Sequence, residues 1–187
     1  MNPLAIIETY YAPNTALYEL LVVHSRAVAD KALFLANQHP ELAIDCKFVE
    51  EAAMLHDIGI FLTNAPSLGC YGTHRYIEHG YLGADLLRQH GLDKHALVCE
   101  RHTGTGLSLA DIEKQQLPLP HRDMRPVSME EQLICFADKF FSKSRLNTEL
   151  TIEQIRDNLA QFGPDNLRVF DYWMSLFKKK KLHITCE

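Results

Sequence analysis

The chain has 187 residues, of which 47% are hydrophobic and 23% charged, so it can bury a sizeable core and is expected to form one globular domain, residues 1–187. Its formal net charge of −5 gives no reason to expect a nucleic-acid polymer or an anionic membrane as partner, and an anionic substrate would need a local basic site. No apolar run is long enough to span a bilayer, and the N-terminus lacks a signal-peptide pattern, so we expect a cytoplasmic protein.

Helical periodicity extends over nearly the whole chain, and no stretch shows the alternation or β-branched clustering of a strand. The sequence therefore predicts an all-α fold, a helical bundle of about seven to nine helices. After a short N-terminal helix, the expected helices lie near residues 14–37, 45–57, 76–90, 93–102, from 109, 128–147, from 151, and 164–181. The last two are expected to pack, as C-terminal helices 151–181, on a core formed by about residues 20–144.

Helix ends are marked by residues that stop or cap a helix. Pro40 ends the first long helix, and Gly59 and Gly91 are placed as C-terminal caps. Three pairs with the spacing of a capping box mark helix starts, namely Ser108 with Asp111, Ser128 with Glu131, and Thr151 with Gln154.

The five cysteines are odd in number and irregularly spaced, and no C-x-x-C motif occurs. This pattern predicts reduced, mostly buried thiols, and neither a disulfide framework nor a thiolate zinc site. They are Cys46, Cys70, Cys99, Cys135 and Cys186.

A histidine and an aspartate stand inside the apolar stretch "MLHDIG", residues 54–59. On a helix, His56 falls four residues after Ala52 on the inward stripe, with Asp57 at its edge. Burying an unpartnered carboxylate costs several kcal/mol, so Asp57 requires a cation, hydrogen-bond donors, or both.

The same anomaly recurs on four other predicted helices, at His24, His79, His102 and Asp138. Each case alone is commonly a hydrogen-bonded core histidine or a member of an ion pair. Together, four histidines and two aspartates facing inward would share their cost by converging on one site. Imidazole and carboxylate ligands without cysteine indicate catalytic iron, manganese, magnesium or zinc, and a carboxylate beside a histidine at a helix end, such as Asp57, can also bridge two metal ions.

"HDIG" at 56–59, with His24 upstream and Asp138 downstream in "FADK", resembles the H…HD…D signature of the HD-domain phosphohydrolase superfamily. The wider chain resembles small stand-alone HDIG-motif proteins. The resemblance covers roughly residues 20–144 and implies an all-helical fold with one or two divalent metal ions. It implies that the first metal is bound by His24, His56, Asp57 and Asp138, and the second by His79 and His102 with Asp57 as the bridge.

The resemblance implies a metal-dependent phosphohydrolase, in which a metal-activated water attacks a phosphoester or phosphoanhydride of a nucleotide or another small phosphorylated metabolite. Iron or manganese is expected first, with magnesium, zinc, nickel and cobalt as alternatives. Asp57, Asp138 and Lys139 are the expected catalytic residues. Ile60 follows HDIG where the HD-GYP branch has lysine, and no GYP motif exists, which argues against cyclic dinucleotide phosphodiesterase activity.

A phosphate also needs hydrogen-bond donors. The candidates for substrate binding are Arg101, Arg122, Arg125, Thr103 and Gly104, with Lys139, Arg75 and Lys143 also near the ligands in sequence. The alternatives are solvated side chains for the basic residues and simple helix termination for the "TGTG" turn. The run Lys178–Lys181 is expected to be a solvated helix end.

Two other functions use features of the same sequence. HD-fold di-iron oxygenases use the same six-ligand set, and they require iron and consume oxygen. A nucleotide-binding sensor would bind its ligand without turnover. The sequence leaves open whether the protein forms a homo-oligomer.

Overall fold

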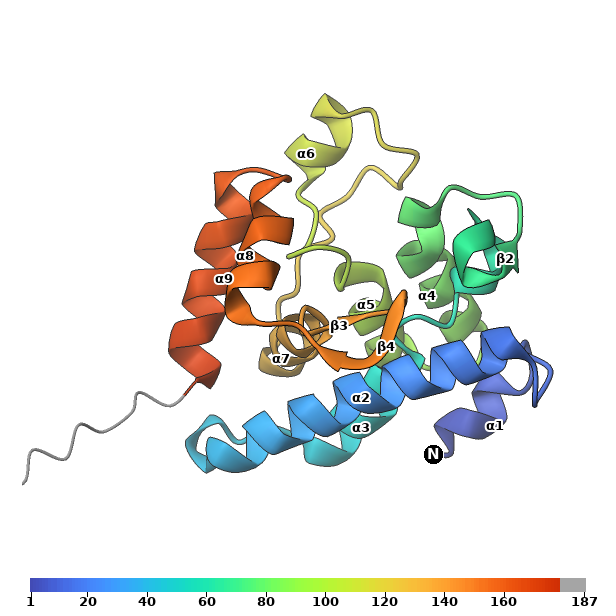
Figure 1. Cartoon of the computed structure of the whole chain (residues 1–187), viewed down its shortest axis with the longest axis horizontal. Coiled ribbons are helices and arrows are strands. Elements are labelled where there is room, and N and C mark those ends of the chain that lie inside the picture. Colours follow the sequence, from blue (N-terminus) through green and yellow to red (C-terminus); the bar gives the residue numbers. More distant parts are fainter. Residues whose placement is uncertain (179–187) are drawn as a thin grey trace, which may run out of the picture.

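The computed structural model describes residues 1–178 of the chain (Figure 1). Over these residues the fold is mainly helical, with only two small two-stranded sheets, and the prediction of an all-α fold is confirmed. The α-helices are α1 (Pro3–Ile7), α2 (Ala16–Gln38), α3 (Cys46–Leu55), α4 (His79–Gln89), α5 (Asp93–Arg101), α6 (Leu109–Lys114), α7 (Met129–Asp138), α8 (Ile152–Ala160) and α9 (Pro164–Phe177). Short 3₁₀ helices are η1 (Pro40–Leu42), η2 (Ile60–Leu62), η3 (Pro66–Leu68) and η4 (Tyr76–Glu78).

The long helix α2 runs along one side of the molecule and packs on α3 and α7, whereas α4 packs on α5 (Figure 1). Helices α8 and α9 lie side by side at one edge, drawn in orange and red. The rings of Phe170, Trp173 and Phe177 on α9 contact Phe136 of α7, which fastens the C-terminal helices to the core. The described part of this C-terminal segment thus contacts α7 through the rings of α9.

Helix starts agree well with the capping signals. Ser108 with Asp111 and Thr151 with Gln154 form reciprocal capping boxes at α6 and α8. Ser128 caps α7 by accepting the N–H of Glu131, but the carboxylate of Glu131 accepts from Val127 N and Arg101 instead. The third box is therefore only half formed.

Gly59 is not the left-handed C-terminal cap that the sequence predicts. Helix α3 ends at Leu55, and Gly59 has φ of −85°. A Cβ at this position would lie 2.3 Å from the carbonyl oxygen of His79 and 2.5 Å from the amide nitrogen of Gly83. Glycine is needed here because α4 approaches the backbone closely. Gly91, with φ of +70°, does have the expected cap conformation.

The helix predicted over residues 128–147 is wrong beyond Asp138. Residues 141–149 form an antiparallel hairpin of β3 (Phe141–Ser142) and β4 (Arg145–Glu149). The segment has little β-branched content, and its pairing depends on contacts with α2 that local periodicity does not show. A second, smaller pair, β1 (Asn64–Ala65) with β2 (Cys70–Tyr71), lies in the expected loop.

Cys70, Cys99 and Cys135 are buried free thiols, and Cys46 is half-buried and free. Cys186 and the lysines after Lys178, including the end of the predicted last helix, lie outside the described residues. Within residues 1–178, every helix is too short or too polar to cross a bilayer.

Candidate metal centre

His56 and Asp57 follow the last turn of α3, and both side chains are completely buried. The inward face of α3 is apolar, and Leu55 and Ile58 on either side of the pair are also buried. The end of the helix is therefore anchored in the core by its apolar residues, and this anchoring fixes the two polar side chains inside the protein.

Four side chains, from α2, α7 and the end of α3, meet at one point. His24 Nε2 lies 3.2 Å from Asp57 Oδ2 and 3.1 Å from Asp138 Oδ1. His56 Nε2 lies 3.0 Å and 3.4 Å from the same two oxygens. The ligand atoms of His24, His56, Asp57 and Asp138 all lie within 4.8 Å of one another, close enough to share one ion.

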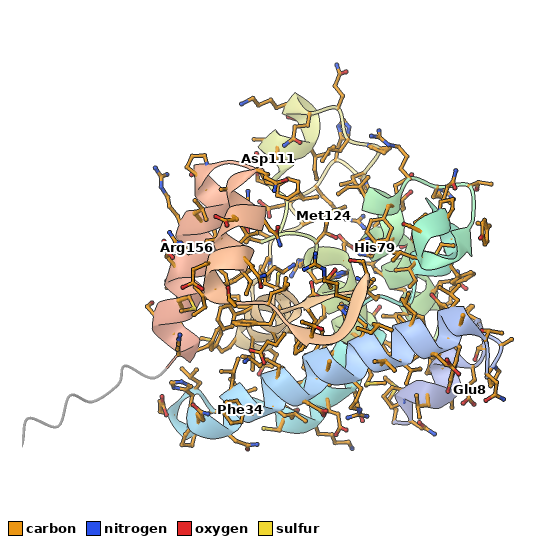
Figure 2. All side chains as sticks on the ribbon, viewed as in Figure 1. Glu8, Phe34, His79, Asp111, Met124 and Arg156 are labelled. Carbon is orange, nitrogen blue, oxygen red and sulfur yellow. The ribbon has the colours of Figure 1, made fainter. Side chains whose placement is uncertain are left out.

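The second oxygen of Asp57 faces another pair of histidines. Its Oδ1 lies 3.3 Å from Nε2 of His79, the first residue of α4, and 3.3 Å from Nε2 of His102, which follows α5. The two imidazole nitrogens are 3.0 Å apart. Asp57 thus directs one oxygen to each group, the geometry of a carboxylate that bridges two ions. Figure 2 labels His79 among the interior side chains.

Three of the imidazoles are oriented by the backbone of their own helix turn. Nδ1 of His56, His79 and His102 lies 2.6, 2.6 and 2.7 Å from the carbonyl oxygen three residues earlier. When Nδ1 donates its proton there, the lone pair of Nε2 points into the centre. This second contact is typical of histidines that bind a metal.

The donor set fits a divalent metal ion. Nε2 of His56 and Oδ1 of Asp57 are buried and form no hydrogen bond among the described residues, and Oδ2 of Asp57 has only an ion pair with Lys143 beside the imidazoles. Leaving such groups unsatisfied costs several kcal/mol in total, which a cation would offset. Nitrogen and oxygen ligands are typical of catalytic iron, manganese or zinc, whereas structural zinc sites commonly use cysteine.

The protonation states of Asp57 and His102 also favour cation binding. Burial lowers the pKa of His56, but Asp57 and Asp138 outweigh it and raise that pKa to about 9, so a metal ion would displace a proton there. Burial raises the pKa of the Asp57 carboxyl, but His56 and Lys143 outweigh it and hold that pKa well below its usual value. Burial lowers the pKa of His102 to about 4, so its imidazole is neutral at physiological pH. An ionised bridging carboxylate and a neutral imidazole are the forms that bind metal.

Two lysines reach the same centre. Lys139 Nζ lies 2.9 Å from Asp138 Oδ2 and donates to the carbonyl oxygen of His102. Lys143 Nζ lies 2.6 Å from Asp57 Oδ2, and the β3–β4 hairpin folds it back over the site. The sequence placed Lys143 only near the ligands along the chain, because a continued helix would have hidden this contact.

A cleft of about 570 Å³ opens onto the centre, lined by Asp138, Lys139, Lys143 and Gly104 and by residues of α8 and the loop after β1. Tyr76 also lines it and stacks on His79 with ring centroids 4.7 Å apart. Thr103 and Gly104 of the "TGTG" turn were both expected to bind substrate. Of these two, Gly104, with φ of +62°, borders the cleft and Thr103 does not.

The three arginines expected to bind substrate do not line this cleft. Arg101 pairs with Glu131 at 2.9 Å, and Arg122 makes two hydrogen bonds to the buried carboxylate of Glu100. Arg125 pairs with the neighbouring Asp123. The structure therefore engages each arginine with a carboxylate, whereas sequence reasoning had no signal for these partners.

Residues 21–142 match the family model of the HD domain. This match covers more than half of the chain, so the chain belongs to the HD domain family, and the resemblance seen in the sequence is confirmed. The family places it in a superfamily of metal-dependent phosphohydrolase type, whose domains bind divalent metals.

Three curated relatives are similar to the chain, and one of them is named as uncharacterised. An uncharacterised protein of Methanocaldococcus jannaschii is 33% identical over 81% of this chain and 84% of its own length. Two proteins named tRNA (cytidine(56)-2'-O)-methyltransferase are also similar. The one from Picrophilus torridus is 30% identical over 88% of this chain and 41% of its own length, and the one from Thermoplasma volcanium is 28% identical over 78% and 38%. The chain thus spans about two fifths of these methyltransferases. No solved structure matches the chain significantly.

Proposed function

We propose that the protein is a metal-dependent phosphohydrolase that acts on a small phosphorylated metabolite. The observation that supports this most directly is the position of Asp57, whose two oxygens face two separate sets of imidazoles while two lysines approach from the cleft. A paired cation site beside fixed ammonium groups is suited to an anionic phosphate.

In this proposal His24, His56, Asp57 and Asp138 hold the first ion, and His79 and His102 hold the second with Asp57. Divalent ions, when bound, supply Lewis acidity, which lowers the pKa of water and neutralises charge on phosphoryl oxygens. Iron or manganese suits these ligands best. The six side chains are positioned in advance by their helices, so little reorganisation is needed when a substrate arrives.

The lysines have separate tasks. Lys139 is held between Asp138 and the carbonyl oxygen of His102, so its ammonium group orients the carboxylate and faces the cleft. Lys143 lies on the hairpin and lines the cleft beside Tyr76. Both ammonium groups are mostly shielded from solvent, where a charge interacts more strongly with a phosphate than it does at an exposed site.

Methyl transfer, the activity in the names of two relatives, is not proposed for this chain. The chain spans about two fifths of those proteins, and the centre that supports the proposal is a cluster of histidines and aspartates. The similarity supports a shared domain and no shared methyl-transfer step.

The proposal is tested by incubating the purified protein with manganese or iron and a panel of nucleotides, dinucleotides and sugar phosphates under anaerobic conditions. Release of phosphate, or of a phosphorylated fragment, without oxygen is expected. Asp57→Asn should abolish it, and Asp93→Asn, at the exposed start of α5, serves as the matched control. Turnover that requires both iron and oxygen would instead identify an oxygenase and contradict the proposal.

A further inference from the structure

Tyr11, which follows α1, is buried against the turn that leads away from Asp57. Its side chain is 3% exposed, and its hydroxyl donates to the carbonyl oxygen of Ile58 at 2.7 Å. The same hydroxyl accepts the N–H of Phe61 at 3.3 Å. Burial raises the pKa of Tyr11, so the hydroxyl keeps the proton that it donates. One side chain thus joins two points of a turn that lie 47 and 50 positions further along the chain.

The hydroxyl takes a place that the backbone of the turn would otherwise fill. The N–H groups of residues 60 and 62 donate to carbonyl oxygens three residues earlier, at 3.0 and 3.2 Å. At the position between them, the N–H of Phe61 and the carbonyl oxygen of Ile58 both bind the hydroxyl of Tyr11 instead. Buried backbone groups need hydrogen-bond partners, so removing the hydroxyl favours a rearranged turn.

The same turn lies against the start of α4. A Cβ on Gly59 would lie 2.3 Å from the carbonyl oxygen of His79, so the two backbones are in direct contact. His79 Nε2 in turn lies 3.3 Å from Oδ1 of Asp57. The turn therefore connects the bridging carboxylate to the second group of imidazoles, and any shift of the turn would move Asp57 relative to His79.

We propose that Tyr11 is a positioning residue for the second metal ion. By holding the turn over residues 57–62, its hydroxyl keeps Oδ1 of Asp57 directed at His79 and His102. The inference rests on the assignment of the two ions in the proposed function. Tyr11 precedes residues 21–142, which match the HD domain, so this chain supplies the contact from outside the matched region.

The test measures metal binding without a substrate. Manganese is titrated calorimetrically into the full-length protein after a chelator has removed bound metal, and the ion that His79→Ala fails to bind identifies the second ion. In Tyr11→Phe, which keeps the ring and removes the hydroxyl, the affinity for the second ion should fall about tenfold, the usual effect of losing a partner behind a ligand. The affinity for the first ion should stay at the wild-type value. Unchanged affinity for the second ion, or an equal loss for both ions, would overturn the inference.

Tyr10→Phe is the matched control. The ring of Tyr10 stacks on Phe61 with centroids 5.9 Å apart, but its hydroxyl contacts His90 and not the turn. This variant should keep both affinities. A second control, Leu35→Ala, removes a buried side chain near the end of α2 and should lower the melting temperature without changing either affinity. If Leu35→Ala weakens the second ion as much as Tyr11→Phe does, the effect is general destabilisation and the inference is wrong.

This inference and the proposed function fail in different ways. Phosphate release by the wild type, together with wild-type ion affinities in Tyr11→Phe, would refute the role of Tyr11 alone. Selective loss of the second ion in Tyr11→Phe, in a protein that releases no phosphate from any compound tested, would refute the hydrolase alone.

Discussion

Lys143 Nζ lies 2.6 Å from Oδ2 of Asp57, the carboxylate at the centre of the proposed metal site. Burial lowers the pKa of Lys143, but Asp57 outweighs it and raises that pKa, so the side chain stays charged. The contact joins the β3–β4 hairpin to the end of α3 and brings a cation to the oxygen that the first metal ion would share.

Replacing this lysine should reduce turnover and leave the ligands in place. We expect Lys143→Met to lower kcat/KM on the order of 100-fold, because one preorganised charge beside the phosphoryl group is lost. Metal content, measured by elemental analysis, should stay at the wild-type value. Lys114→Met, on exposed α6, should retain activity. Wild-type kcat/KM in Lys143→Met would show that the ammonium group has no role in turnover.

Gly59 should be intolerant of any side chain. An added Cβ would lie 2.3 Å from the His79 carbonyl oxygen, a backbone atom that cannot move without shifting α4. Gly59→Ala should therefore lower the free energy of unfolding by about 2–3 kcal/mol and displace His79. The measurement is urea denaturation, with metal content as a second readout.

Gly91→Ala provides the comparison. Its Cβ would meet nothing within 4 Å, so only the strain of φ +70° applies, at about 1–2 kcal/mol. Its metal content should be normal. If Gly59→Ala proves as stable as wild type, the close approach of α4 to the end of α3 is incorrect.

Glu100 should make stability depend on pH in acid. Burial raises the pKa of this carboxyl, but hydrogen bonds from Arg122 and Arg88 outweigh it and leave the pKa below its usual value of 4.5. A lowered folded-state pKa stabilises the protein above the unfolded-state pKa, and this stability is lost as pH falls through the folded value.

The measurement compares the melting temperature of wild type and Glu100→Gln, both metal-free, between pH 7 and pH 3. Wild type should be the more stable at pH 7, and the difference should shrink below about pH 4.5 as the carboxyl is protonated. A difference that stays constant across this range would mean that the carboxylate charge contributes nothing.

The sequence alone singled out the six proposed ligands because each follows apolar residues at helical spacing, within a helix or just past its end. His24 and Asp138 interrupt apolar stripes on α2 and α7, and the structure brings them within 3.1 Å of each other. Helix starts were also readable, since a cap such as Thr151 depends on residues only three positions away.

Features that depend on contacts between residues far apart in the sequence could not be predicted. The hairpin that follows Asp138 pairs residues whose composition resembles a polar helix, so Lys143 could not be placed. Arg122 was expected near substrate as a donor for phosphate. Its partner, the buried Glu100, lies in another element, and this ion pair cannot be recognised from sequence spacing.

The most direct test of the account is the metal content of the purified protein and of two variants, measured by elemental analysis after loading with manganese or iron. Wild type should bind about two ions per chain, and His79→Ala about one, because His79 belongs only to the group that holds the second ion. His56→Ala should bind fewer ions than His79→Ala, because His56 belongs to the four-residue group that holds the first ion. Wild-type stoichiometry in both variants would contradict a centre in which Asp57 joins two metal ions.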